Sequence, residues 1–133
     1  MLQLMKGVVQ SGTGGRLRYR FGLNNPIAGK TGTTQNNSDG WFMGITPDIA
    51  AGVWVGAEDR SIHFRSTDLG QGATMALPIW GLFMKKVYAD KTLKISQGDF
   101  EGIEKYPGIY DCDKFEEEIN EEKDPFGSSI FNK

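Results

Sequence analysis

The sequence of 133 residues is poor in the residues that build metal sites, disulfides and membrane spans. It contains one cysteine, Cys112, and one histidine, His63, which excludes an internal disulfide and a cysteine-based zinc site. No apolar run approaches the ~18 residues that a transmembrane helix needs, so no membrane segment is expected in this chain. The net charge of -2, without a basic stripe, argues against a nucleic-acid partner.

Charge is divided unevenly along the chain. Residues 1–95 contain 11 Lys and Arg against 6 Asp and Glu, whereas residues 96–133 contain 4 Lys against 11 Asp and Glu. The second part is also poor in aliphatic residues, and such a composition is typical of a solvated chain that builds no core. We therefore expect one folded domain over residues 1–95 and a flexible, poorly ordered acidic tail over residues 96–133.

Apolar periodicity predicts helices at both ends of the folded part and strands between them. Apolar residues within residues 2–9 are spaced like one face of a short helix, which the glycine-rich residues 11–15 end. Short connections between successive strands favour an antiparallel meander. Strands are predicted over residues 27–33, 41–45 and 49–55, and a half-buried strand or extended arm over residues 17–21.

The last predicted element is a helix over residues 73–89, which is apolar almost all round in its middle and therefore buried. Pro78 lies inside this pattern and should kink the helix or mark its true start. The second and third strands are nearly continuous apolar runs, which predicts helices on both faces of the sheet. Together these elements predict an α+β fold, with a core that includes Trp41, Phe42, Trp54 and Trp80.

The most informative segment is residues 27–34, Ile-Ala-Gly-Lys-Thr-Gly-Thr-Thr. Its Gly-Lys-Thr matches the end of a phosphate-binding loop, but that motif needs a glycine where this chain has Asn24. A phosphate-binding loop should also lead into a helix, and the residues after Thr31 do not favour one. The alternative is the K-T-G element of serine enzymes that act on penicillin, here Lys30, Thr31 and Gly32.

These residue types suit a ligand that ends in a carboxylate. Lys30 supplies a cation, and Thr31 and Thr33 supply hydroxyl donors. Gly32 has no side chain, so a substrate backbone can lie close against the strand. A backbone N–H just after the triplet can point at a developing oxyanion.

The wider context resembles the class A penicillin-binding proteins, which are bifunctional peptidoglycan synthases. The resemblance covers roughly residues 2–90, where a G-T-G turn, K-T-G-T-T, D-x-W-F-x-G, V-W-V-G and A-x-P-I-W follow in this order. It implies the C-terminal part of a transpeptidase domain. The implied fold is the β-lactamase and transpeptidase-like one, with a partial antiparallel sheet packed by helices.

The resemblance also implies roles for single residues. Lys30 would face the cleft and support both the proton relay and the substrate carboxylate, which Thr31 and Thr33 would bind through their hydroxyls. The amide of Thr33 would be one oxyanion donor, and Gly32 would allow close approach. No cofactor and no metal are implied. Positions that look structural in the family are matched by Asp39, Trp41 and Gly44.

The nucleophile of this chemistry has no match in the chain. No serine is followed three residues later by lysine, and none begins S-x-N. The expectation is a piece of a D,D-transpeptidase, inactive alone, whose complete form cross-links peptidoglycan through an acyl-serine intermediate. Two alternatives stay open, a non-catalytic module of the same shape and a part of a serine β-lactamase.

The resemblance extends to partners and location. The complete protein would bind peptidoglycan stem peptides and β-lactams, and this chain would pack against the upstream part of the same domain. The expected location is the periplasmic or cell-envelope face, with an upstream segment as the anchor in the inner membrane.

Overall fold

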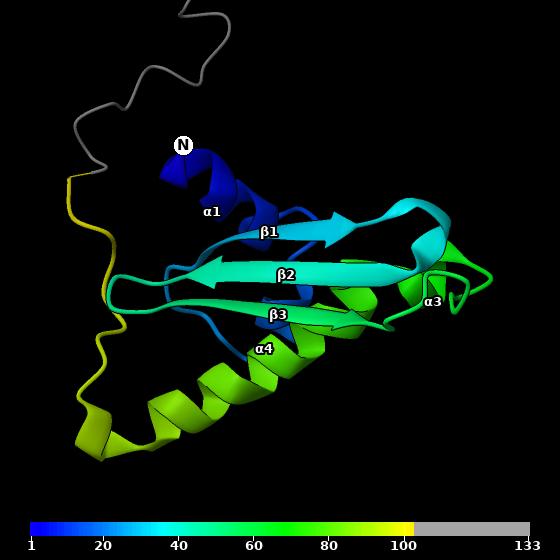
Figure 1. Ribbon diagram of the computed structural model, residues 1–133. Coiled ribbons are helices and arrows are strands. Elements are labelled where there is room, and N and C mark those ends of the chain that lie inside the picture. The colour runs from blue at the N-terminus through cyan, green and yellow to red at the C-terminus, as the bar shows by residue number, and fades with distance from the viewer. Residues whose placement is uncertain (103–133) are drawn as a thin grey trace, which may run out of the picture. The chain divides into compact units, whose positions relative to one another are not determined.

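The structure is a computed structural model, and it describes residues 1–102 (Figure 1). Cys112 and most of the predicted acidic tail lie outside those residues. The helices and strands follow one another as α1 (Leu2–Gln10), α2 (Arg16–Tyr19), β1 (Ala28–Thr33), β2 (Asp39–Ile45), β3 (Ala50–Gly56), α3 (Thr67–Gly70) and α4 (Gly72–Ala89). Two short 3-10 turns, Gln35–Asn37 and Lys91–Leu93, complete the order.

The three strands form an antiparallel sheet in the order β1-β2-β3, as predicted. Lys30 lies opposite Met43, and Met43 lies opposite Gly52. A tight turn joins β2 to β3. It is closed by a hydrogen bond from the amide of Thr46 to the carbonyl oxygen of Ile49, at 2.8 Å. The amide of Ile49 donates in return to the Thr46 hydroxyl at 3.2 Å. The predicted meander and the α+β fold class are confirmed.

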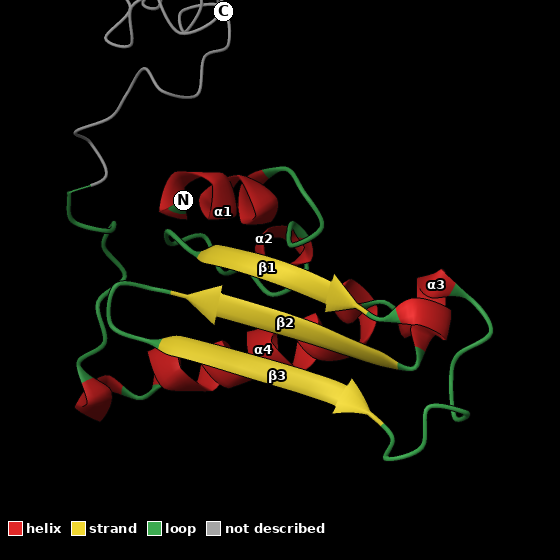
Figure 2. Cartoon of the chain, turned by 45° about the horizontal axis from the view of Figure 1, so that its top comes forward, coloured by secondary structure: helices red, strands yellow, loops and turns green. Residues whose placement is uncertain are grey.

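Helix α4 lies across one face of the sheet and supplies much of the core (Figure 2). Its Trp80 is fully buried and meets Phe42 edge-to-face, with ring centroids 5.4 Å apart and ring planes at 71°. The indole N–H of Trp80 donates to the carbonyl of Ala51 at 3.1 Å, so its polar atom is satisfied. The helix starts at Gly72 and runs through Pro78, which therefore does not mark its start.

The predicted strand over residues 17–21 is wrong. Arg16–Tyr19 form the short helix α2, and the chain then turns at Gly22 with a φ of 68°. Leu17 is fully buried, and Phe21, in the turn after α2, packs against the core. The Arg18 guanidinium secures the turn by donating to the carbonyls of Leu23 and Asn25, at 2.7 and 2.5 Å.

Helices on both faces of the sheet were also predicted, and within residues 1–102 this is wrong. Trp41, Met43 and Trp54 all lie on the face away from α4, and they are 45%, 43% and 47% exposed. With Gly52 and Gly56 they form what we call the outer sheet face. An apolar run cannot tell which of its two faces is covered, because side chains alternate between the faces. Phe42 and Trp80 are core residues as predicted, whereas Trp41 and Trp54 are half exposed.

Candidate functional site

The K-T-G triplet lies on β1, an edge strand of the sheet in the part of the chain that the structure describes. The amide of Thr34 donates to the carbonyl of Asp39 at 3.2 Å, which makes Thr33 and Gly40 a non-hydrogen-bonded pair. Inward- and outward-directed backbone groups alternate along an antiparallel strand. The N–H and C=O groups of Thr31 and Thr33 therefore point away from β2, toward the edge of β1 that pairs with no further strand within residues 1–102. We call this the open edge of β1.

Lys30 brings its charge to this open edge. Its register opposite Met43 places it on the outer sheet face, where it is exposed. The ammonium then bends back and donates to the carbonyl of Thr31 at 2.6 Å. Because that carbonyl points away from β2, the Lys30 ammonium lies beside the edge and not over the middle of the sheet.

The hydroxyls of Thr31 and Thr33 lie on the opposite face, the one toward α4. Thr31 pairs with the buried Phe42, and its Oγ1 is 2.9 Å from the Oγ1 of Thr13. The Oγ1 of Thr33 accepts the amide N–H of Gly72 at 3.1 Å. Residues two apart on a strand are about 7 Å apart along it, so both hydroxyls flank one short stretch of edge.

Gly72 was not singled out by the sequence, although it fixes the start of α4 against the strands. A Cβ on Gly72 would lie 2.2 Å from the carbonyl oxygen of Trp41 and 2.4 Å from that of Gly32. Only glycine lets the helix begin so close to two backbones, and this closeness puts its amide on Thr33. A glycine immediately before the predicted helix start at residue 73 was the signal available in the sequence.

The phosphate-loop interpretation fails on the same geometry. After Lys30 and Thr31 the chain continues as a strand to Thr33, and the first helical turn that follows is the three-residue Gln35–Asn37. A phosphate loop instead directs the amide groups at the start of a helix toward the anion. The site on β1 instead presents a lysine, two hydroxyls and the outward amides of Thr31 and Thr33 along a strand.

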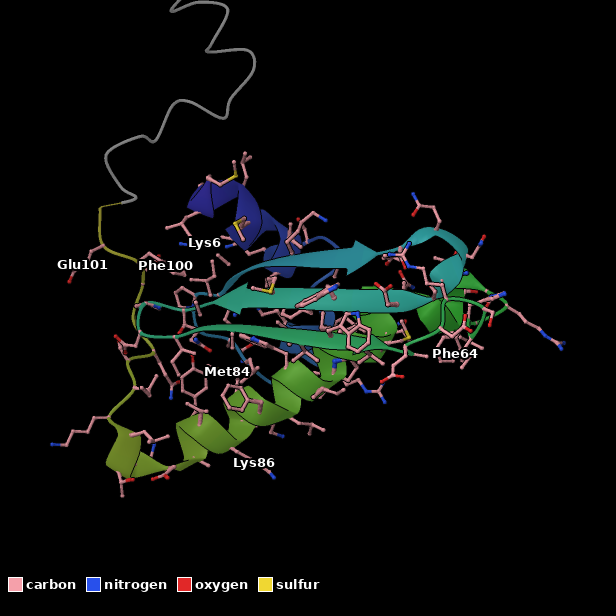
Figure 3. The ribbon with its side chains drawn as sticks, viewed as in Figure 1. Lys6, Phe64, Met84, Lys86, Phe100 and Glu101 are labelled. Carbon is pink, nitrogen blue, oxygen red and sulfur yellow. The ribbon has the colours of Figure 1, made fainter. Side chains whose placement is uncertain are left out.

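An open cavity of about 330 Å³ lies elsewhere, beyond the end of β3. It contains neither the K-T-G residues nor Thr33. Its lining is mostly apolar and includes Phe64, which is labelled in Figure 3. His63, at its rim, is exposed. No group of three or more potential metal ligands occurs within residues 1–102.

Two of the positions that look structural in the family are tightly packed in this fold. A Cβ on Gly44 would lie 2.3 Å from the Trp80 side chain. The indole of Trp80 therefore fits against β2 only because residue 44 has no side chain. Asp39 is nearly buried at the start of β2, and its amide donates to the Thr34 hydroxyl at 3.1 Å. Trp41, the third, is half exposed on the outer sheet face.

Comparison with known proteins identifies relatives of this chain. No protein-family model matches it, but individual proteins do. Penicillin-binding protein 1A of Neisseria cinerea is 37% identical over 101 residues, which cover 74% of this chain and 12% of the relative. The protein of that name from Clostridium acetobutylicum is 39% identical over 94 residues, covering 71% and 11%. This chain is homologous to penicillin-binding protein 1A.

The homology extends across distant bacteria. Penicillin-binding protein 1A of Pseudomonas aeruginosa is 37% identical over 94 residues, which cover 70% of this chain and 11% of the relative. The chain thus spans about an eighth of the length of the penicillin-binding protein 1A relatives it matches. In the described part of the chain, no helix has the length and apolar character required to cross a bilayer.

Proposed function

We propose that this chain supplies the substrate-clamping strand of a penicillin-binding D,D-transpeptidase, which cross-links peptidoglycan through an acyl-serine intermediate. The observation that carries the proposal is that four groups lie along one short stretch of β1, at its open edge and on the adjoining face toward α4. These are the Lys30 ammonium, the hydroxyls of Thr31 and Thr33, and the outward amide of Thr33. Homology to penicillin-binding protein 1A supports the reaction class.

The clamp would hold the terminal carboxylate of a stem peptide. Lys30 offers a charge-assisted donor at the edge, and such bonds are roughly twice as strong as neutral ones. Thr33 accepts the N–H of Gly72, so its own proton remains available to a carboxylate. Gly32 has no side chain between these groups, which lets an extended peptide lie along β1 as an added strand.

The same edge would stabilise the developing negative charge. The Thr33 amide points away from β2, in the direction from which an edge-bound peptide presents its carbonyl. A fixed N–H at that position costs no reorganisation when the oxyanion forms. The nucleophilic serine and its lysine base have no match in the chain, so they would come from another part of the transpeptidase domain.

The outer sheet face suits that arrangement. Trp41, Met43 and Trp54 expose contiguous apolar surface beside Lys30, and such a patch marks a surface made for packing. We place the rest of the transpeptidase domain there. The complete protein would then work at the periplasmic or cell-envelope face, held to the inner membrane by a segment outside these residues.

Carboxylate binding by the chain tests the proposal. We expect N-acetyl-D-alanyl-D-alanine to shift the amide resonances of Thr31, Gly32 and Thr33 in a ¹⁵N-labelled sample. The same peptide with a C-terminal amide should shift them far less. Lys30→Gln should raise the dissociation constant about tenfold to a hundredfold, because a hydrogen bond to a charged group contributes about 1.5–3 kcal/mol.

Lys86→Gln is the matched control, since Lys86 is exposed on α4, away from β1 (Figure 3). It removes the same charge and should leave the dissociation constant unchanged. Equal shifts with the carboxylate and amide peptides would contradict the proposal, and so would a Lys30→Gln variant that binds as tightly as the wild type.

A second expected result follows from the missing nucleophile. A fluorescent penicillin should leave the chain unlabelled after denaturing electrophoresis, because no serine lies three residues before a lysine. The complete penicillin-binding protein 1A of Pseudomonas aeruginosa, treated in parallel, should be labelled. A stable fluorescent band at the mass of this chain would show that one of its own side chains is acylated.

A further inference from the structure

We propose that Thr13 is a positioning residue for carboxylate recognition, acting through the hydroxyl of Thr31. The two Oγ1 atoms are 2.9 Å apart, although the residues are 18 positions apart in the sequence. The inference rests on the proposed function, since it assigns a second residue to the same site. Thr13 itself need not touch the substrate.

The turn that carries Thr13 is built to hold it in one place. The amide of Gly14 donates to the carbonyl of Val8 at 2.9 Å, and that of Gly15 donates to Gly12 at 3.0 Å. A Cβ on Gly12 would lie 2.9 Å from the Val8 carbonyl oxygen, and one on Gly14 would lie 3.1 Å from it. Glycine on each side of Thr13 lets the chain fold back tightly on the end of α1.

The chain beyond this turn is anchored to α4. The Arg16 guanidinium donates to the carbonyl of Ala73 at 3.3 Å and to the hydroxyl of Thr74 at 3.2 Å. Helix α1 packs along β1 on the other side of the turn. Thr13 is therefore held between α1 and α4, and its hydroxyl meets β1 at the second residue of the K-T-G triplet.

The direction of the hydrogen bond gives this contact its effect. Either hydroxyl can donate, but a carboxylate only accepts. A carboxylate at Thr31 therefore selects the arrangement in which Thr13 donates to Thr31 and Thr31 donates to the ligand. Gly72 serves Thr33 in the same way, because its N–H donates to the Thr33 hydroxyl and leaves that proton available. Chains of hydrogen bonds in one direction strengthen each other.

Thr13→Val tests the assignment, because valine keeps the shape of the side chain and removes only the hydroxyl. We expect the dissociation constant of N-acetyl-D-alanyl-D-alanine to rise about threefold to tenfold, the range for one hydrogen bond. Thr13→Ser restores the hydroxyl and should bind within about twofold of the wild type. Thr92→Val is the matched control, since the Thr92 hydroxyl bonds only locally to Asp90.

A double-mutant cycle separates a positioning role from a merely structural one. If Thr13 acts through Thr31, Thr13→Val should have no further effect on binding in a Thr31→Val background. A structural defect would weaken binding equally in both backgrounds. Amide spectra of each variant report whether the fold is kept. A Thr13→Val variant that does not fold would itself overturn the assignment, because the contact is exposed and should contribute little to stability.

The outcomes for the two proposals are distinct. Carboxylate-dependent binding that Thr13→Val retains at wild-type affinity would overturn the role of Thr13 alone. The same holds if Thr13→Ser binds as weakly as Thr13→Val. Wild-type binding that ignores the carboxylate, or no binding at all, would overturn the proposed function and this inference with it.

Discussion

Trp80→Ala is expected to lower the free energy of unfolding by about 3–5 kcal/mol, the range for removing a large buried aromatic side chain. Trp80 is fully buried, packs edge-to-face on Phe42 and donates to the carbonyl of Ala51. Small domains are stable by only about 5–15 kcal/mol, so this loss removes a large share of the free energy of unfolding. Urea denaturation followed by far-UV circular dichroism measures the change.

Trp54→Ala is the control for this experiment. Trp54 lies on the outer sheet face and is 47% exposed, so its replacement should cost about 1 kcal/mol or less. The two variants lose the same atoms and differ in burial. Equal losses of stability would mean that α4 and β2 do not pack as described. A larger loss for Trp54 would mean that the outer sheet face is covered in solution.

Gly72→Ala is expected to destabilise the chain by about 1–3 kcal/mol or more, the cost of forcing extra atoms into a packed interface. The new Cβ would lie 2.2 and 2.4 Å from two backbone carbonyl oxygens, of Trp41 and Gly32, which cannot rotate away. The start of α4 must therefore move off the sheet. This movement would take the amide of Gly72 from the Thr33 hydroxyl, so carboxylate binding should weaken with stability.

Gly7→Ala is the matched control, because nothing lies within 4 Å of a Cβ on Gly7 in α1. Alanine there should stabilise the helix by about 0.5–1 kcal/mol, through its better helix propensity. Thermal melts of the two variants should shift in opposite directions. A Gly72→Ala variant as stable as the wild type would contradict the close contact of α4 with β1 and β2.

Local pattern was enough for most of the elements. The strands predicted over residues 27–33, 41–45 and 49–55 and the helix over residues 73–89 occur, because their apolar periods extend over enough residues to choose between helix and strand. Residues 17–21 were misassigned because their few apolar residues fit both periods. In the structure, the burial of Leu17 and the hydrogen bonds of Arg18 to two carbonyls stabilise a helix there. These contacts form only in the folded chain, so the local sequence pattern does not reveal them.

For the candidate site too, some features could be predicted from the sequence and others could not. Lys30, Thr31, Gly32 and Thr33 were predictable because they are consecutive, and their role as substrate-binding and oxyanion-donating residues stays a prediction. The boundary between the folded domain and the acidic tail near Ser96 also stays a prediction. The family was predictable because its motifs follow one another along the chain, and the homologous penicillin-binding protein 1A sequences confirm it.

By itself, the sequence determined the three strands and the helix that follows them, the residue types of the K-T-G strand and the absence of an S-x-x-K pattern. Only the tertiary structure decided that Thr13 and Gly72 meet the two threonine hydroxyls, across 18 and 39 residues of chain. It also decided that the strand's outward groups and the Lys30 ammonium share one edge. The physical reason is that these contacts depend on strand register and on the close approach of glycines, which leave no periodic signal in the sequence.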